Sequence, residues 1–246
     1  LGGMLRLVVL RVALVVRSIA TAQDLPVLHP VLEAGPDLSL ERYAAFADFD
    51  SLLNAATPLS PTGKTRLEVL YVEIGETLES PCDLIGMGCS WYCGGGPDTV
   101  WASSSLTATN DLSYAATNAH DLDACTVWCE GVAGPGVGEQ LVYRFAPESP
   151  RLHTILVVNG LTRERSLWQA NNRVRVVDVA EDGVLLYTLA LADTMDIQRF
   201  KLPSLLGKRE DGLPLELSFT IRSVYPGNRH DDTVITEIYF DGTDVH

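Results

Sequence analysis

The sequence predicts an all-β protein: a jelly-roll β-sandwich with a small mixed N-terminal extension. From residue 99 onward, strand-length apolar segments recur, turn residues separate them, and no helical pattern comes between them. A chain of 246 residues can hold one large domain, or one domain with a smaller attachment. We expect a leader at 1–22, an extension of unknown role at 23–80, a Cys- and Gly-rich connector at 81–98 and the sandwich at 99–246.

The N-terminus is typical of an export signal. No acidic residue precedes Asp24, and residues 20–22 (Ala-Thr-Ala) have the small-x-small pattern of a signal-peptidase site. Arg11 splits the apolar run, so a transit peptide or upstream read-through stays an alternative. We therefore expect a secreted, periplasmic or cell-surface protein with an imperfect signal peptide. No later apolar run approaches the ~20 residues that span a bilayer, so we expect no membrane span.

The extension and the connector carry mixed signals. Residues 39–56 place Leu, Tyr and Phe at helical spacing behind Ser39, which predicts a helix. Residues 59–65 (LSPTGKT) predict a turn or linker. Residues 66–76 (RLEVLYVEIGE) alternate apolar and polar side chains, which predicts a strand. Residues 89–99 are rich in glycine and aromatic side chains and are not expected to form a regular element.

The sandwich region contains seven strand-length segments. In one of them, apolar side chains from Leu215 to Ile221 alternate with polar ones, so the two kinds fall on opposite faces. The sequence Glu-Asp-Gly at 181–183 predicts a tight hairpin turn. The seven expected strands are 138–146, 151–160, 172–180, 183–190, 197–203, 215–224 and 233–242.

Five cysteines, Cys82, Cys89, Cys93, Cys125 and Cys129, suggest two disulfides and one spare thiol in an exported protein. A four-cysteine zinc site is a weaker alternative, because structural zinc sites usually begin with Cys-x-x-Cys. If the chain between the last two cysteines were extended, their Cα atoms would lie ~13 Å apart, too far for a bridge. Either that loop turns back sharply or these two cysteines pair elsewhere.

Composition and motifs argue against nucleic-acid binding and against the common catalytic sites. The formal net charge is −14 with a pI of about 4.6, whereas a phosphate-binding surface needs clustered Lys and Arg. The sequence has no Gly-x-Ser-x-Gly, His-Glu-x-x-His or phosphate-loop motif, and His120 and His153 are isolated and expected to be structural. We expect no enzymatic activity and no organic cofactor, although the many acidic residues leave a catalytic carboxylate pair as an alternative.

The stretch 118–139 contains the spacing Asp121-x-Asp123-x-x-Thr126-x-Trp128. Carboxylates and a hydroxyl in one loop supply the hard oxygen ligands that Ca²⁺ prefers, and the indole can close the end of the sandwich. The alternative is that the two aspartates only cap turns through backbone hydrogen bonds, and spacing alone favours it.

The stretches 159–177 and 223–242 carry more polar and aromatic side chains than a sandwich requires. Amide and guanidinium donors beside an aromatic ring can bind sugar hydroxyls, and long ordered loops on a rigid sheet often carry function. The alternatives are that Trp168 fastens its loop to the core while the asparagines hold turns, and that the last strand is a solvated edge. The candidate ligand-binding residues of the three stretches are Trp128, Glu130, Asn159, Arg163, Trp168, Asn171, Asn172, Arg173, Tyr225, His230, Asp231 and Asp232.

Four segments resemble one known family: GCSWYCGGGP, NAHDLDACTVWCEGVAGPGVGE, NGLTRERSLWQANNRVRVV and YPGNRHDDTVITEIYFDG. In their order and spacing, residues 89–242 resemble the discoidin-like (coagulation-factor type C) sandwich attached to bacterial NAD glycohydrolases, often called the NADase-type glycan-binding domain. The resemblance covers about three-fifths of the chain and implies a galactose-binding-like jelly roll.

This resemblance also implies a role and a metal. It implies attachment to carbohydrate or to a cell surface rather than catalysis. Related sandwiches often carry one structural calcium ion on the Asp-x-Asp-x-x-Thr loop, closed by a late glutamate. The implied ligands here are Asp121, Asp123, Thr126 and Glu237.

Two departures from the family pattern leave the ligand open. Cys125 and Cys129 stand where ordinary residues are expected, which implies an added bridge at the loop, and His230 replaces an aromatic or lysine-like residue. We expect a glycan or cell-surface ligand, with a protein partner as the alternative. A part of an NAD glycohydrolase or another hydrolase is less favoured, because about 60 residues between leader and glycine-rich segment are too few for a catalytic domain.

Overall fold

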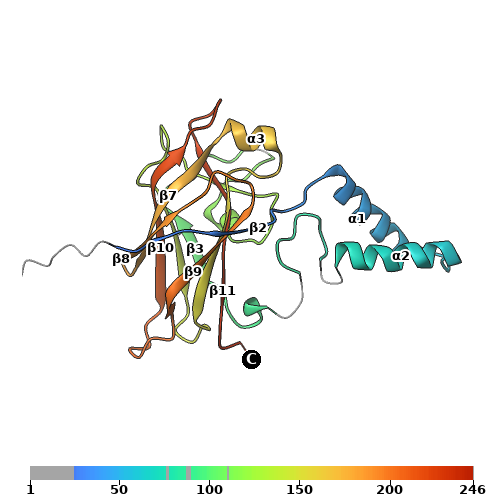
Figure 1. Cartoon of the computed structure of the whole chain (residues 1–246), viewed down its shortest axis with the longest axis horizontal. Helices are drawn as coiled ribbons and strands as arrows, with labels where there is room; N and C mark the ends of the chain where they lie inside the picture. The colour runs from blue at the N-terminus through green and yellow to red at the C-terminus, as the bar shows by residue number, and fades with distance from the viewer. Residues whose placement is uncertain (1–24, 76–77, 87–89, 110, 246) are drawn as a thin grey trace, which may run out of the picture.

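A computed structural model describes residues 25–75, 78–86, 90–109 and 111–245. The expected leader and Cys89 lie outside these ranges. The chain forms a β-sandwich with a pair of helices standing at its side (Figure 1). No helix within the described ranges is long and apolar enough to cross a membrane.

All seven expected strands are confirmed. The hairpin turn is also confirmed: Asp182 and Gly183 have φ values of 47° and 78°, and the strand residues on either side of them pair directly. The sandwich strands are β3 (Thr99–Ala102), β4 (Trp128–Cys129), β5 (Gln140–Phe145), β6 (Leu152–Asn159), β7 (Asn172–Glu181), β8 (Val184–Ala190), β9 (Ile197–Leu206), β10 (Leu215–Tyr225) and β11 (Thr233–Gly242).

The strands form two layers. Antiparallel pairing places β3, β5, β10, β7 and β8 in one layer and β9, β6 and β11 in the other. The layers are joined where β11 pairs with β7 in parallel, beginning at Thr233 and Asn172. Two short strands of the extension, β1 (Val27–Leu28) and β2 (Val31–Glu33), pair with β8 and β9. The extension therefore adds one strand to each layer.

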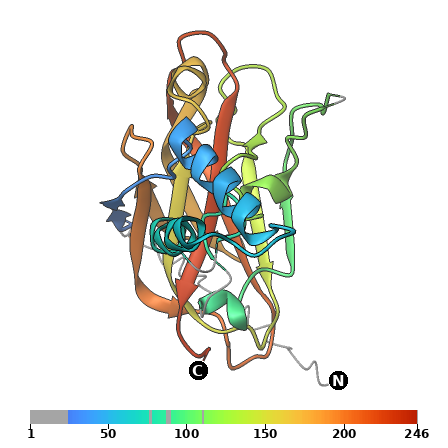
Figure 2. The same cartoon turned by 90° about the vertical axis from the view of Figure 1, so that its right-hand side faces the viewer.

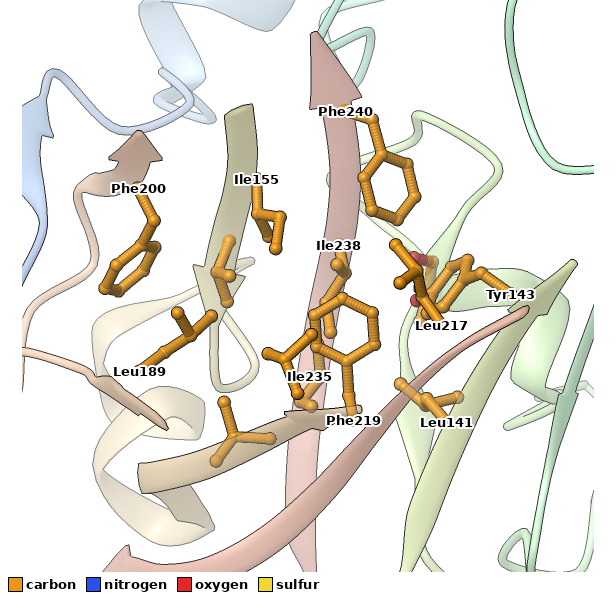
Figure 3. Packing of buried hydrophobic residues seen from close by; sticks show 14 of the residues in the cluster. Leu141, Tyr143, Ile155, Leu189, Phe200, Leu217, Phe219, Ile235, Ile238 and Phe240 are labelled. Carbon is orange, nitrogen blue, oxygen red and sulfur yellow. Dashed lines mark hydrogen bonds between the residues drawn. The ribbon is translucent and has the colours of Figure 1, made fainter. Parts of the chain in front are cut away.

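The hydrophobic core fills the space between the layers (Figure 3). The apolar side chains of β10 from Leu215 to Ile221 are at most 2% exposed, which confirms the alternation expected for this strand. From the opposite layer, Phe240 packs edge-on against Tyr143 and Phe145, with ring centroids 5.3 and 5.1 Å away. The two layers thus meet through interlocking aromatic and branched side chains.

The extension contains two helices that pack on each other (Figure 2). The expected helix is α1 (Leu40–Leu53), with Ser39 as its N-cap. The strand expected at 66–76 is wrong, since these residues lie almost entirely in α2 (Pro61–Ile74).

Helix α2 also begins inside the stretch taken as a turn. Ser60 accepts a hydrogen bond from the Gly63 N–H, and Pro61 occupies the first turn, where its missing N–H costs nothing. Leu70 and Ile74, four positions apart, are buried on the same face. The apolar side chains of residues 66–76 fit both the two-residue repeat of a strand and the 3.6-residue repeat of a helix. The N-terminal cap at Ser60 favours the helix over the strand.

Three short helical turns interrupt stretches that were expected to be irregular or strand-to-strand connections. The Cys- and Gly-rich connector contains the 3-10 helix η1 (Trp91–Cys93), and a second 3-10 helix, η2 (Ala116–Ala119), precedes β4. Helix α3 (Arg165–Ala170) lies between β6 and β7. The expectation that no helix separates the sandwich strands is therefore wrong. Helix α3 lies at the end of the sandwich where the candidate site is found.

Candidate functional site

A cavity of about 530 Å³ opens beside α3. Helix α3 lies at the upper end of the sandwich in Figure 2. Its floor is apolar, because Val127, Cys129 and Val234 form a small buried cluster against Leu106 and Leu161. Its rim is polar and aromatic. The rim residues are Asp111, Ser113, Tyr114, Arg163, Asn171, His230 and Asp232. An apolar floor below a few convergent polar groups is the usual composition of a small-molecule site.

Four candidate ligand-binding residues line this cavity: Arg163, Asn171, His230 and Asp232. The side chains of Arg163, His230 and Asp232 have no hydrogen bond or ion pair to another residue in the described ranges. The amide of Asn171 donates to the Leu167 carbonyl at 2.9 Å and closes the end of α3. Three unengaged polar groups therefore face the same space.

The loop that follows β3 contributes residues that the sequence did not single out. Leu106, Leu112 and Tyr114 all line the cavity, and Leu112 is 51% exposed. The only local signal is an apolar and an aromatic side chain within a run of small polar residues. Such a signal does not show that this loop folds over the end of the sandwich.

Trp168 and Arg173 are both buried behind the cavity. The Arg173 guanidinium lies over the indole, with its Cζ 4.4 Å from the ring centroid, and pairs with Asp193 at 2.9 Å. The indole N–H donates to the Asn159 carbonyl at 2.9 Å. The Asn159 side chain in turn bonds both backbone groups of Val174, at 2.7 and 2.9 Å. These three side chains bond to the protein itself and hold the backbone behind the cavity in place. This arrangement agrees with the packing alternative for Trp168 and not with direct ligand contact.

Asn172 holds the turn after β10. Its amide donates to the Asp231 carbonyl at 2.6 Å, and its carbonyl oxygen accepts from the Gly227 N–H at 2.6 Å. The side chain is 2% exposed. Asp231 itself is exposed but does not line the cavity. Tyr225, at the end of β10, donates its hydroxyl to the Leu191 carbonyl at 2.9 Å.

Trp128 and Glu130 are completely buried below the cavity. The Trp128 indole donates to the Ser104 carbonyl at 3.0 Å and fills the end of the core. The Glu130 carboxylate accepts from the backbone N–H groups of Val132 and Thr233, at 2.9 and 3.1 Å. Both residues connect loops to strands and are enclosed by protein.

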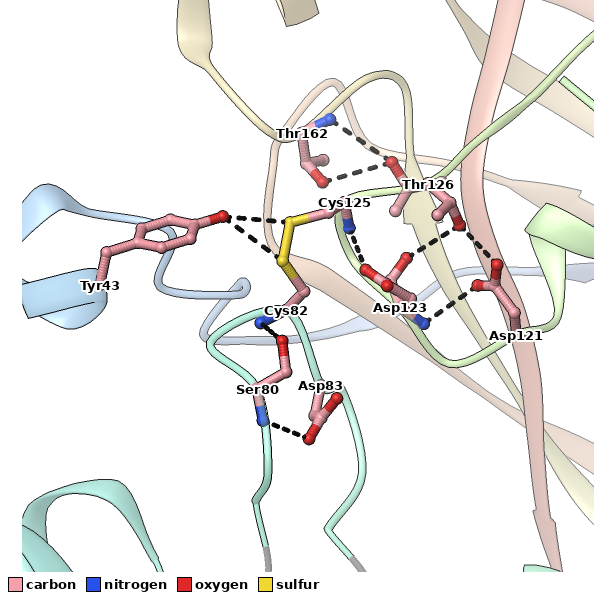
Figure 4. Close-up of a disulfide and its surroundings, with 10 residues drawn as sticks. Tyr43, Ser80, Cys82, Asp83, Asp121, Asp123, Cys125, Thr126 and Thr162 are labelled. Atoms are coloured by element: carbon pink, nitrogen blue, oxygen red, sulfur yellow. Dashed lines mark hydrogen bonds between the residues drawn. A yellow bond between two sulfur atoms is a disulfide. The ribbon is translucent and has the colours of Figure 1, made fainter. Parts of the chain in front are cut away.

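Figure 4 shows the candidate cation loop, residues 121–126. The loop borders the cavity, because Cys125 and Thr126 belong to its lining. Asp121 accepts from the Thr126 hydroxyl at 2.7 Å and from the Asp123 N–H at 3.1 Å. Asp123 accepts from the Cys125 N–H at 2.7 Å. These are turn-capping bonds, and they leave each carboxylate with further lone pairs for a cation.

Glu237 reaches this loop from β11, so the last strand and the loop do meet. Its Oε2 accepts from the Leu122 N–H at 3.1 Å, while its buried Oε1 has no hydrogen-bond partner among the described residues. Burial raises the pKa of Glu237 well above its usual range, and the charges of Asp121 and Asp123 raise it further.

Among the described residues, no Lys or Arg forms an ion pair with Asp121, Asp123 or Glu237. The nearest candidate is His120, whose Nδ1 lies 3.8 Å from Glu237 Oε1. However, Nδ1 donates to the Ile238 carbonyl at 2.8 Å, and burial lowers the pKa of His120 to about 4. The imidazole is therefore neutral at physiological pH, as expected for a structural histidine. A buried carboxylate oxygen without a partner, with two further carboxylates in the neighbouring loop, is a donor set of the kind that calcium uses. In the described structure, the oxygens of Asp121, Asp123 and Glu237 do not all lie within 4.8 Å of one another, so a cation would have to draw them together.

A disulfide joins Cys82 to Cys125 at the edge of the cation loop (Figure 4). Cys125 therefore does not pair with Cys129. The spacing had left two possibilities open, and for Cys125 the structure shows the second, a partner elsewhere in the chain. The two sulfurs and the Asp123 carboxylate form the one tight group of possible metal ligands in the described part of the chain. Disulfide sulfurs are not thiolates, so this group is not a metal site. Burial raises the pKa of the Cys129 thiol to about 12.

Comparison with known proteins gives one family. The model of the NAD glycohydrolase translocation F5/8 type C domain matches residues 91–241, more than half of the chain. A search of the curated proteins found no match.

Several solved structures are similar in part. The CBM32-1 and CBM32-2 domains of Clostridium perfringens ZmpB are 14% identical over 84% of this chain, with a TM-score of 0.43. This chain spans about half of that structure, 51% of its length. The Streptococcus pyogenes NAD⁺-glycohydrolase translocation domain is 30% identical over 48% of this chain and 98% of its own, with a TM-score of 0.34.

Proposed function

Because the chain belongs to the NAD glycohydrolase translocation F5/8 type C domain family, we propose that it is a non-catalytic module that binds a cell-surface carbohydrate. The cavity beside α3 is the proposed site, and the observation that carries this proposal is its composition. Tyr114 and Leu112 offer apolar contact to one face of a sugar ring, while Arg163 and Asp232 offer a donor and an acceptor to its hydroxyls.

Attachment to a surface also suits the family description, which concerns the translocation of an NAD glycohydrolase. A module that holds a secreted protein at a cell surface raises its local concentration there without any catalytic group of its own. We therefore place the protein outside the cell or at its surface.

Arg163→Ala is expected to weaken glycan binding about tenfold or more, because it removes a charged hydrogen-bond donor of the rim. The measurement is a glycan-array screen followed by titration of the best ligand. Arg165→Ala is the matched control, since Arg165 is exposed on α3 but does not line the cavity. Absence of any glycan ligand, or equal binding by both variants, contradicts the proposed site.

We also propose that the cation loop and Glu237 hold one structural calcium ion. Asp121, Asp123, Thr126 and Glu237 would supply oxygen ligands, and the ion would offset the negative charge that Asp121 and Asp123 place around Glu237. The loop borders the cavity through Thr126, so an ordered loop keeps one wall of the proposed site in place.

Calcium at about 100 times its dissociation constant is expected to stabilise the protein by about 2.7 kcal/mol and to raise Tm by about 5–10 °C. The measurement is thermal unfolding with calcium and with a chelator. Glu237→Gln should abolish the difference, because it removes the buried carboxylate. Glu210→Gln, at an exposed position, should keep it. An equal Tm in calcium and in chelator contradicts the proposal.

A protein partner is the second candidate, and the helical pair favours it. Leu40 and Val72 are 83% and 86% exposed, and the pair stands away from the sandwich (Figure 1). Val72→Asp is expected to abolish retention by a protein partner while glycan binding persists. Leu213→Asp, 55% exposed in a loop, is the control. If only the cavity variants reduce surface binding, the partner reading is wrong.

A further inference from the structure

A second hollow lies on the outer face of the layer formed by β3, β5, β10, β7 and β8. Strand register places five side chains in one row across it: Trp101, Val142, Ser218, Ala180 and Leu185. The row has large side chains at both ends and small ones in the middle. The result is a trough of about 460 Å³ that runs along β10, with Trp101 and Leu185 as its opposite walls.

The trough is lined by polar groups on either side of this row. Gln140, Thr220 and Asp178 form the next row across the strands, and Glu216 and Arg222 extend the lining along β10. Alternate residues of a strand point to the same face, so the β10 side chains repeat every ~6.8 Å. The trough thus offers a regular series of hydrogen-bonding groups.

Most of these groups are unengaged. Within the described ranges, the side chains of Gln140, Ser218 and Thr220 form no hydrogen bond. Asp178 and Arg222 are the exceptions: they pair with each other at 3.3 Å, and Asp178 also accepts from the Thr188 hydroxyl at 2.9 Å. The charges of Asp178 and Arg222 cancel each other, so the carboxylate of Glu216 gives the trough a net negative charge. A negative trough disfavours anionic ligands.

Trp101 is the aromatic side chain of the trough. It is 38% exposed, whereas Trp91, Trp128 and Trp168 are 3%, 0% and 7% exposed. An indole on an edge strand, beside a floor of small side chains, provides an apolar platform next to hydroxyl and amide groups. This combination suits a ligand that is apolar on its flat faces and polar at its edges.

We infer that the trough binds a linear, neutral oligosaccharide that lies along β10 with one ring against Trp101. None of its lining residues lines the cavity beside α3, so it is a separate site and does not depend on the proposed function. A covering protein domain fits less well, because the buried centre of a protein interface is mainly apolar, whereas six of the eleven residues that line this trough are polar.

The test measures acrylamide quenching of tryptophan fluorescence in the full chain, which reports chiefly on Trp101 because the other three indoles are buried. The probes are cellohexaose, chitohexaose and mannohexaose. At least one is expected to lower the quenching constant, and calorimetry should then give an affinity that Ser218→Tyr weakens about tenfold or more by filling the trough. Trp101→Ala, followed by calorimetry alone, is the second variant, and unchanged Tm values show that both variants fold.

Arg163→Ala separates the two sites, because it alters the cavity and leaves the trough intact. Hexasaccharide binding that survives Arg163→Ala and is lost in Ser218→Tyr supports the trough even if the cavity proves to bind no sugar. The inference is overturned if no hexasaccharide protects Trp101. It is also overturned if Arg163→Ala abolishes the binding while Ser218→Tyr retains it.

Discussion

Arg173→Ala is expected to lower the free energy of unfolding by about 2–4 kcal/mol, because it removes a buried guanidinium that bonds two backbone carbonyls and the more exposed Asp193 carboxylate. The guanidinium is 6% exposed and forms three hydrogen bonds to the Asp193 carboxylate, at 2.9 to 3.1 Å. It also donates to the carbonyls of Asn171 and Pro226, at 2.9 and 3.0 Å. Truncation leaves these acceptors without their donor and removes the contact with Trp168.

The measurement is equilibrium unfolding in urea. Arg163→Ala is the matched control, since this arginine is exposed, and its stability should change by no more than about 0.5 kcal/mol. Arg173→Lys should fall between wild type and Arg173→Ala, because it keeps the charge but loses the planar fork of donors. If Arg173→Ala unfolds like the control, the guanidinium contributes nothing to the wall of the cavity.

The contrast between these two arginines shows what the sequence could not reveal. Both lie in the stretch 159–177 and both are plausible ligand contacts from residue type alone. Burial separates them, and the partners that bury Arg173 lie 20 and 53 residues away, at Asp193 and Pro226. Asn172 is similar, because its amide bonds a turn 59 residues away. Local patterns do not carry such information.

The sandwich could be predicted because its signals are local. Alternation along β10 and the Asp-Gly turn at 182–183 each depend on a few neighbouring residues, and the structure confirms both. Helix α2 could not be assigned by the same means, since its apolar residues satisfy two periods. The cap formed by Ser60 and Pro61 decides between them, and it was present in the sequence.

The cavity was predictable only in part, for a related reason. Arg163 and His230 lie on loops that flank strands of the predicted sandwich, so their place at one end follows from the topology. Tyr114 lies on the loop after β3, a strand that was not among those expected from the sequence, and only the folded chain brings it to the rim. Glu237 is intermediate: a glutamate on the last strand could close the Asp121 site only if that strand meets the loop, and the family resemblance implied this meeting whereas spacing alone did not show it.

Removing the disulfide with Cys82→Ser and Cys125→Ser together is expected to lower the free energy of unfolding by about 2–4 kcal/mol. The bond closes a loop across a sequence separation of 43, so its loss frees a large part of the unfolded chain. In the folded chain, the Tyr43 hydroxyl lies 3.4 and 3.2 Å from the two sulfurs and would lose this contact (Figure 4). Unfolding in urea, with and without reductant, measures the effect.

Reductant should lower the stability of the wild type and leave the double variant unchanged. Equal stability of the oxidised wild type and the double variant would show that the disulfide does not stabilise the fold.

The same variant should also weaken calcium binding. The disulfide holds the connector against the cation loop, where Ala124 N–H donates to Cys82 O at 2.7 Å and Leu84 N–H to Leu122 O at 3.0 Å. Leu122 also donates its own N–H to Glu237, so the connector orders the backbone that orients the buried carboxylate. A loop released from the connector must be ordered again on binding, and that ordering costs affinity. Calorimetric titration with calcium should therefore give a larger dissociation constant for the double variant, whereas an unchanged constant would mean that the loop is fixed by the sandwich alone.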